Sequence, residues 1–340
     1  MRSNQRPTMK DVAEHAEVSV STVSYVLNNN GQVSPERRAR VLNAVQLLDY
    51  IPNESARSLK RRSSSTIGLV VPDLVNQFFS LLARGVVRAA AVHDVLVVLC
   101  SAENTEEAEF GNARLLRSQR VDGVIYESGF HESPNSLLEL QSLGPVVLVD
   151  ERVTGIDLPA IVSDGRRGAR EVATHVVSLG HKRIACIAGP MALWTAEQRL
   201  AGYREGLAMG GINPDDMLIR VGDYGMDSGY KQAESLLNDV PNNERPTALL
   251  CANDMMAIGA LEYCRAQNIK VPDEISVVGF DDVPTAQLLT PRLTTVRQPA
   301  YEMGMSAAEM LIGLLKGEQV GEMDPHPVEV IVRESTSKPK

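Results

Sequence analysis

The sequence predicts a small all-α head with a helix-turn-helix, joined to a larger α/β body of two lobes. Short capped helical segments follow one another closely near the N-terminus, and ten short apolar runs alternate with helical patterns from residue 66 onward. The charge is divided in the same way. Residues 1–62 hold ten Lys and Arg against six Asp and Glu, a net charge of +4, whereas the remaining residues carry −13 and the whole chain −9. A basic head on an acidic body indicates a small polyanion-binding module attached to a separate domain.

The head is predicted to contain three helices. Thr8 can cap the first, and Ser19 can cap a second helix over residues 20–27 after a tight turn. Ser34 followed by Pro35 is a typical start for the third. Two short helices at this close spacing are what a helix-turn-helix requires. The small core that they are expected to bury consists of Val12, Ala13, Val18, Val23, Val41, Leu42 and Val45.

Residues 18–28 can be interpreted in two ways. Their first residues alternate like a strand, yet Val20, Val23 and Leu27 fall on one face of a helix. We predict a helix, because the neighbouring helices offer a strand no partner. Its outward face then consists of Ser21, Thr22, Ser24, Tyr25 and Asn28. Such side chains fit the major groove of DNA, where they contact base edges and phosphates, but periodicity alone fits a solvated polar face equally well.

A short basic segment follows the head. Asn53 can cap a helix over residues 54–60, in which Leu59 lies among basic side chains. So short a helix is not stable alone in water. Composition by itself therefore favours an ordinary basic linker over a helix with a function.

The body is predicted to contain parallel sheets whose strands alternate with helices. The expected strands are residues 66–71, 95–100, 122–127, 145–150, 160–164, 183–189, 217–221, 247–251, 275–280 and 328–333. The first four are interpreted as buried strands. Ten strands are many for one open sheet, which favours two lobes with a ligand between them at the carboxyl ends of the strands. The polar residues at those ends are Asp73, Asp150, Asp164, Asn253, Asp254, Asp281 and Asp282, although each of them fits a helix cap or a turn as well.

Several classes of function lack support in the sequence. It contains no G-x-G-x-x-G after the first strand, no P-loop, no G-x-S-x-G and no H-E-x-x-H, so we expect neither an enzyme nor a cofactor. The six histidines show no metal-ligand spacing, and the four cysteines lie far apart, which favours buried thiols over a metal site or disulfides. No apolar run is long enough to span a membrane, and the N-terminus lacks the apolar core of a signal peptide. We therefore expect a cytoplasmic protein.

Five stretches resemble a known family, namely "DVAEHAEVSVSTVSYVLN", "YIPNESARSLK", "RLAGYREGL", "ANDMMAIGAL" and "ISVVGFDD". They are similar to lactose/galactose-repressor-type (LacI/GalR) transcription regulators, and the similarity continues through the whole chain. The resemblance implies a helix-turn-helix domain in residues 1–52, a hinge helix and linker in 53–65, and a type I periplasmic-binding-protein-like effector and dimerisation domain in 66–340. Lobe 1 is then about 66–162 and 293–324, and lobe 2 about 163–292 and 325–340. Such a protein is a homodimeric repressor that binds double-stranded palindromic operator DNA and a small sugar-like effector.

The resemblance also implies which residues contact DNA. These are Thr8, Ser19, Val20, Ser21, Thr22, Ser24, Tyr25, Asn28, Asn53, Ala56, Arg57, Leu59 and Lys60, with Leu59 at the position of a minor-groove wedge. One position departs from the family, because Tyr25 stands where an arginine often contacts guanine. A phenol cannot make that bidentate contact, so the base preference of the family does not carry over to this position.

Effector contacts in the family map onto Phe78, Phe79, Asp150, Asp164, Thr195, Arg199, Tyr224, Asn253 and Asp281. Carboxylates and amides can bind vicinal hydroxyls, Arg199 can bind ring or anionic oxygens, and aromatic rings can cover the apolar face of a sugar. For one of Phe78 and Phe79, packing in the core is a credible alternative. Two other classes stay open, a regulator whose coregulator is a phosphorylated carrier protein, and an enzyme or free sugar-binding protein. The basic head argues against the second of these.

Overall fold

The computed structural model describes residues 7–27, 33–50, 64–102, 106–127, 137, 140–153, 155–241, 244–321 and 323–340. The chain divides into two compact units, residues 1–64 and 65–340. The predicted hinge helix and its residues, from Asn53 to Lys60, lie outside the described residues, as does Asn28.

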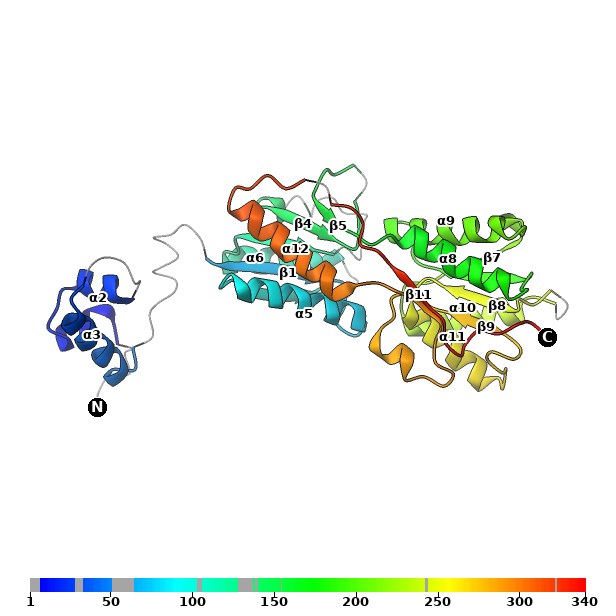
Figure 1. The fold of residues 1–340 in the computed structure, drawn as a ribbon, viewed down its shortest axis with the longest axis horizontal. Helices are drawn as coiled ribbons and strands as arrows, with labels where there is room; N and C mark the ends of the chain where they lie inside the picture. Colours follow the sequence, from blue (N-terminus) through cyan, green and yellow to red (C-terminus); the bar gives the residue numbers. More distant parts are fainter. Residues whose placement is uncertain are drawn as a thin grey trace. The chain divides into compact units, whose positions relative to one another are not determined.

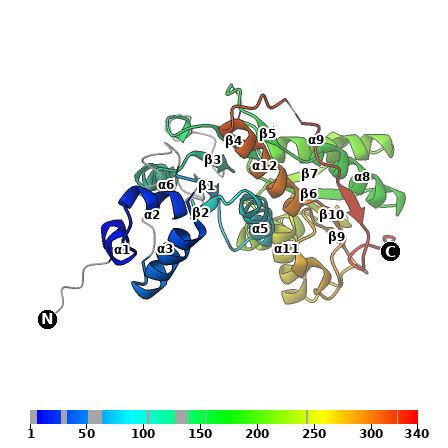
Figure 2. The ribbon, with the colours of Figure 1, turned by 60° about the vertical axis from the view of Figure 1, so that its left-hand side comes forward.

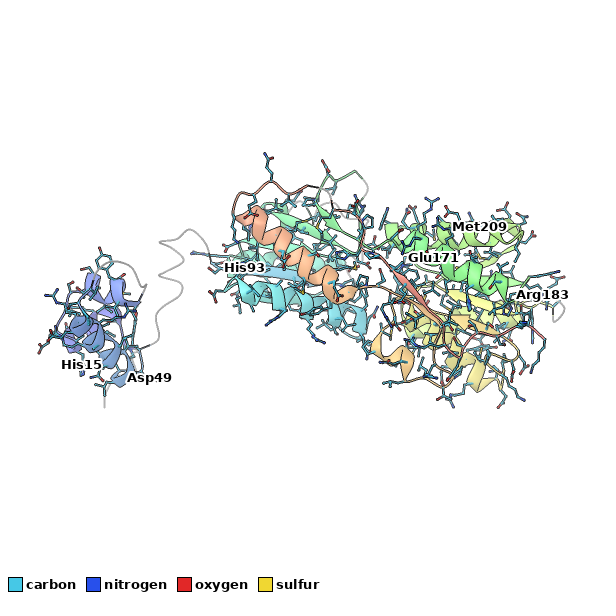
Figure 3. All side chains as sticks on the ribbon, viewed as in Figure 1. His15, Asp49, His93, Glu171, Arg183 and Met209 are labelled. Carbon is cyan, nitrogen blue, oxygen red and sulfur yellow. The ribbon has the colours of Figure 1, made fainter. Side chains whose placement is uncertain are left out.

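The head contains the three predicted helices, α1 (Met9–His15), α2 (Val20–Leu27) and α3 (Pro35–Leu47). The backbone N–H of Asp11 donates to the Thr8 hydroxyl, and the Asp11 carboxylate accepts from the Thr8 backbone, which makes a complete capping box. The Thr22 N–H donates to the Ser19 hydroxyl at 3.2 Å and caps α2. The predicted helix starts are therefore confirmed. His15 and Asp49, labelled in Figure 3, mark the last residue of α1 and the turn after α3.

One residue of the predicted head core, Leu42, is exposed, and Val18 and Val45 are half-buried. Leu42 is 47% exposed, because Val41 and Ala44 line the inner side of α3 and each helical residue is turned by about 100° from the one before it. Val20, which the periodicity placed on one face of the helix with Val23, is 45% exposed, because α2 turns Val23 and Val26 inward. The buried core consists of Val12, Ala13, Ala16, Val23, Val26, Val41, Ala44 and Tyr50.

The second unit contains two parallel sheets, seen side by side in Figure 1. The first has the order β2-β1-β3-β4-β5. Its strands are β1 (Thr66–Val71), β2 (Leu96–Ser101), β3 (Gly123–Tyr126), β4 (Val146–Val149) and β5 (Ala160–Ile161). β2 was predicted to be buried, but it is an edge strand, and Leu96 and Leu99 are 65% and 43% exposed.

The second sheet has the order β7-β6-β8-β9. Its strands are β6 (Ile184–Ala188), β7 (Leu218–Val221), β8 (Ala248–Cys251) and β9 (Ser276–Val278). A separate antiparallel pair is formed by β10 (Thr295–Arg297) and β11 (Glu329–Ile331). Every predicted run contains a strand, whereas β10 was not predicted.

Helices cover both sheets. Those near the first sheet are α5 (Gln77–Val92), α6 (Glu106–Gln119) and α12 (Ala300–Leu315). Those near the second are α8 (Gly165–Ser178), α9 (Trp194–Met209), α10 (Met226–Asn238) and α11 (Asp254–Ala266), and the short 3-10 helices are η1 (Pro214–Asp216) and η2 (Pro284–Gln287). α5 packs on α12, α8 on α9 and α10 on α11, and the first two pairs can be followed in Figure 2.

The chain crosses between the two sheets three times. It leaves the first sheet after β5, returns with α12, and ends on the second sheet, where the N–H of Val277 donates to the carbonyl of Ser335. We name the parts around the two sheets lobe 1 and lobe 2. None of the described helices is long and apolar enough to cross a membrane. All four cysteines are free and buried.

Candidate functional site

The outward face of α2 presents hydroxyl groups. Ser21 and Tyr25 are exposed, while Thr22 and Ser24 are half-buried. The Ser19 hydroxyl lies 2.8 Å from the hydroxyls of both Ser21 and Thr22, so these side chains order one another at the start of the helix. Tyr25 is 53% exposed. The face is thus small and polar, with one aromatic side chain standing out from it.

A hollow of about 700 Å³ lies beside the start of α2. It is lined by Lys10, Ala13, Glu14, Glu17, Val18, Ser19, Val20, Thr22, Arg37 and Arg40. Arg40 is partly neutralised by Glu17, 3.5 Å away. Lysine and arginine beside a hydroxyl face are suited to a phosphate backbone. Thr8 uses its hydroxyl to cap α1, so its side chain already has a structural task.

Lobes 1 and 2 meet at a buried guanidinium. Arg199 of α9 lies 3.9 Å from Asp150, which follows β4 in lobe 1, and 3.6 Å from Asp281, which follows β9 in lobe 2. Its Nη1 donates to the carbonyl of Ala252 at 2.6 Å, and its guanidinium lies 4.3 Å from the centre of the Phe280 ring. The structure therefore brings together three of the predicted residues from opposite sides of one site.

Burial changes the acid–base properties of both carboxyls. Loss of solvent raises the pKa of Asp150 to about 7 and that of Asp281 to about 6, even though Arg199 acts in the opposite direction on each. Asp281 also accepts a hydrogen bond from Gln298 at 2.8 Å, and the Ser163 hydroxyl donates to the other end of the Gln298 amide. Ser163 and Gln298, which stand next to β5 and β10, tie this carboxylate to two of the crossovers between the lobes.

The backbone is unusual at three residues of the site. Asp150, Tyr224 and Asp281 have backbone φ angles of 63°, 68° and 113°. Residues other than glycine rarely adopt positive φ angles. Such conformations cost free energy and cluster at ligand-binding sites. All three residues directly follow strands or the turns after them, where the sequence predicted a ligand site.

Glu151 belongs to the same site and was not predicted. It is 1% exposed, and its carboxylate accepts hydrogen bonds from the Thr195 hydroxyl and, at 3.2 Å, from the Thr195 N–H. Leu193, at the N-cap of α9, provides no side-chain cap, so a carboxylate from lobe 1 caps a helix of lobe 2. The Thr195 hydroxyl also lies 3.2 Å from the hydroxyl of Tyr224. The only signal in the sequence was the position of Glu151 directly after Asp150.

Other predicted residues have structural tasks. Phe78 and Phe79 are buried in the core and contact each other edge to face at 5.4 Å. Asp164 caps α8, and Asn253 caps α11 while its amide donates to the carbonyl of Tyr224 at 2.9 Å. The carboxylates of Asp73, Asp254 and Asp282 bind backbone groups, a hydroxyl or arginines close to their strand ends.

No group of His, Cys, Asp and Glu among the described residues is arranged to hold a metal ion. Arg199, its two carboxylates and the cluster of Glu151, Thr195 and Tyr224 lie together where the two lobes meet. These side chains can form hydrogen bonds and ion pairs with a ligand.

The chain matches two family models. Residues 8–53 match the bacterial regulatory proteins of the lacI family, and residues 173–336 match a periplasmic binding protein-like domain. It is 37% identical to the HTH-type transcriptional repressor CytR of Escherichia coli (strain K12), over 97% of this chain and 96% of that protein.

Two solved structures are similar along nearly the whole chain. A lac repressor dimer bound to operator and the anti-inducer ONPF has a TM-score of 0.85 and 32% identity, and covers 98% of this chain and 100% of its own. A complex of the transcriptional regulator CelR with cellobiose has a TM-score of 0.73 and 32% identity, and covers 97% and 100%.

Proposed function

The chain belongs to the lacI family of bacterial regulatory proteins, and from this premise we propose that it is a repressor that binds a near-palindromic operator as a homodimer and responds to a small sugar-like effector. It is a DNA-binding transcriptional regulator and not an enzyme. We place its action in the cytoplasm, where operator DNA is found. We also propose the domain bounds 1–52, 53–65 and 66–340, with the lobe ranges given above.

The observation that carries the DNA-binding proposal is the outward face of α2. Ser21 and Tyr25 are exposed on this face, and Val20 and Thr22 at its start line a hollow together with Lys10 and Arg37. In a helix-turn-helix this helix lies in the major groove and its first residues contact base edges. The proposed DNA contacts are the residues predicted above, including the hinge residues that lie outside the described part of the chain.

Dimerisation is supported by apolar side chains that lobe 1 leaves exposed. Val87 and Val92 of α5 are 52% and 70% exposed, and Leu96 and Leu99 lie on the neighbouring edge strand β2. An exposed apolar patch of this kind is typical of a protein–protein interface. Two heads in one dimer would contact successive major grooves of a symmetric operator.

The effector proposal rests on Arg199 between Asp150 and Asp281. A ligand that contacts both lobes favours their closed arrangement over an open one. It can shift the equilibrium between the closed and open arrangements only as far as its affinities for the two differ. Such coupling between two sites is typically about 1–3 kcal/mol. The CelR–cellobiose complex supports a sugar-like ligand for this chain as well.

The test begins with selection of DNA duplexes from a random pool by the purified protein. We expect a near-palindromic consensus and an affinity whose logarithm falls steeply with the logarithm of salt concentration, because lysines and arginines displace counterions. A matched control is the Arg199→Ala variant, which should bind the selected operator equally well but respond to sugars only at concentrations one to two decades higher. Selection without a consensus would contradict the proposal. A response that requires a phosphorylated carrier protein instead of a sugar would favour that coregulator.

A further inference from the structure

The turn between α1 and α2 holds an acidic residue in an unusual backbone conformation. Glu17 has a φ angle of 50°, in the left-handed region that glycine adopts most readily. The turn of a helix-turn-helix often contains glycine, and a glutamate at this φ angle carries a conformational cost that glycine avoids. The N–H groups of Glu17 and Val18 donate to the carbonyls of Glu14 and Ala13. These bonds involve the backbone alone, so the turn itself does not explain a glutamate side chain.

The Glu17 side chain binds an arginine of α3. Nη1 of Arg40 lies 3.5 Å from the Glu17 carboxylate, and Nη2 of Arg40 donates to the Glu17 carbonyl at 3.4 Å. One guanidinium thus contacts both the backbone and the charged group of the turn. The pair is open to solvent, since the side chains of Arg40 and Glu17 are 43% and 83% exposed. An exposed ion pair of this kind is weak, so another anion can displace the glutamate from the arginine.

The pair of Glu17 and Arg40 lies in the wall of the hollow beside the start of α2. The basic side chains that line this hollow are Lys10, Arg37 and Arg40, and the acidic ones are Glu14 and Glu17. Two hydroxyl-bearing residues at the start of α2 line it as well. A phosphate group that entered the hollow would meet a guanidinium whose charge is already paired, and the carboxylate beside it would repel the phosphate.

We propose that Glu17 sets the strength of DNA binding by occupying Arg40, so that a phosphate of the DNA backbone must displace the Glu17 carboxylate in order to bind the guanidinium. Arg40 is then a phosphate contact, and Glu17 is a positioning residue that acts through it. The inference rests on the proposed function, because it concerns the proposed DNA-binding face. Phosphate contacts carry no sequence information. Glu17 is therefore expected to lower the affinities for operator and for random duplex by the same factor and to leave the preferred bases unchanged.

The Glu17→Gln variant of the full chain removes the charge and keeps a side chain of the same size in the turn. At low salt we expect it to bind both the selected operator and a random duplex about two- to fivefold more tightly than the wild type does. The logarithm of its affinity should also fall more steeply with the logarithm of salt concentration, by about 0.9 in slope, because one further phosphate is neutralised. Anisotropy titrations of labelled duplexes over a range of salt concentrations measure both quantities. Equal affinities and slopes for the two proteins would overturn the inference.

A double-mutant cycle with Arg40→Gln shows whether Glu17 acts through Arg40. Once Arg40 is replaced, Glu17→Gln should change neither affinity nor slope, because the guanidinium that it releases is gone. An equal gain without Arg40 would mean that Glu17 repels phosphate directly, which overturns the role of Arg40. Glu171→Gln is the control for charge alone and should match the wild type. Glu171, labelled in Figure 3, is a carboxylate on α8 in the second unit and pairs with Arg167 at 3.3 Å.

The Glu17→Gly variant separates the charge from the backbone of the turn. Glycine suits the φ angle of 50° and also removes the carboxylate, so this variant should match Glu17→Gln in affinity and in slope. A gain in affinity for Glu17→Gly alone would mean that the backbone of the turn controls DNA binding, and would overturn the inference. A wild-type protein that selects no consensus from the duplex pool contradicts the proposed function itself. If it does select an operator and Glu17→Gln binds that operator like the wild type, only the role of Glu17 is contradicted.

Discussion

At the scale of single residues, Asp150 combines a strained backbone and deep burial with an oxygen that has no hydrogen-bond partner among the described residues. Burial raises its pKa to about 7 from an ordinary value of 3.8. Between these pH values the folded protein holds a proton that the unfolded chain has lost, so this group lowers the free energy of unfolding as the pH rises through the window. The penalty is complete above pH 7 and absent below pH 4.

An Asp150→Asn variant cannot titrate at this position and avoids that penalty. We expect its free energy of unfolding to exceed that of the wild type by on the order of 2 kcal/mol above pH 7, with the difference closing toward pH 4. Chemical unfolding at a series of pH values, followed by the fluorescence of Trp194, checks this. Trp194 is the single tryptophan of the chain and begins α9, next to the site. Parallel pH profiles for the two proteins would show that Asp150 is ionised throughout the range.

Tyr25 is the residue of the head where this chain departs from its family. Its ring is exposed, and it can offer one hydrogen bond to a base edge or pack on a thymine methyl. The Tyr25→Arg variant should change the preferred base at one symmetric pair of operator positions, with a discrimination of about 1–3 kcal/mol there. Selection from a random duplex pool with each protein measures the change. The same consensus for both proteins would mean that Tyr25 does not contact bases.

At the scale of elements, the sequence was most informative where structure is local. Helix caps depend on residues three apart, so the starts of α1, α2 and α3 were predictable. β10 was missed because it has only three residues and its partner β11 lies more than thirty residues further along the chain. Leu42 was misplaced because its neighbour Val41 is equally apolar and only the packing of the three helices selects which one is buried.

The candidate effector site shows the same difference between local and long-range contacts. The strand-end residues Asp150 and Asp281 could be predicted from the rhythm of strands and from the family resemblance. The contact of Glu151 with Thr195 joins residues 44 positions apart in different lobes, and no local pattern predicts it. The burial of both Phe78 and Phe79 likewise depends on how α5 packs.

The pairing of α5 with α12 depends on two glycines. A Cβ added to Gly304 would lie 2.1 Å from the carbonyl oxygen of Leu82, a rigid backbone atom, and Gly85 meets the carbonyl of Tyr301 in the same way. Gly304→Ala should therefore separate the helices and lower the free energy of unfolding by about 1–3 kcal/mol or more.

The matched control is Gly111→Ala on α6, where an added Cβ meets nothing within 4 Å. Alanine is a better helix former than glycine there, so this variant should be more stable by about 1 kcal/mol. Thermal and chemical unfolding of the two variants beside the wild type compare the effects. Equal stability of Gly304→Ala and the wild type would show that the two helices can move apart at little cost.

At the scale of the whole molecule, DNA binding and effector binding are proposed to belong to two separate units of the chain. The head holds its own core of eight buried residues, and the second unit holds three further clusters, one of which contains residues of both lobes. The net charge follows the same boundary, since positive charge gathers in the part that is proposed to bind DNA. Any effect of the effector on operator binding is then a coupling between the two units, because operator and effector are proposed to bind to different units.

Removal of residues 1–64 tests this division. The remaining residues 65–340 form a compact unit by themselves, so they are expected to stay folded, dimeric and able to bind the effector, while operator binding is lost. Calorimetric titration with the sugar that the full chain binds best, sedimentation of the truncated protein and a DNA-binding assay measure the three properties. The matched control is the full chain carrying Arg199→Ala, which should show the opposite pattern. Its operator binding should be kept, while its effector affinity should fall by one to two decades, because a charge-assisted hydrogen bond contributes about 1.5–3 kcal/mol. If the truncated protein still bound the operator tightly, the DNA-binding surface would lie in the lobes, and the face of α2 would be no more than a solvated helix surface.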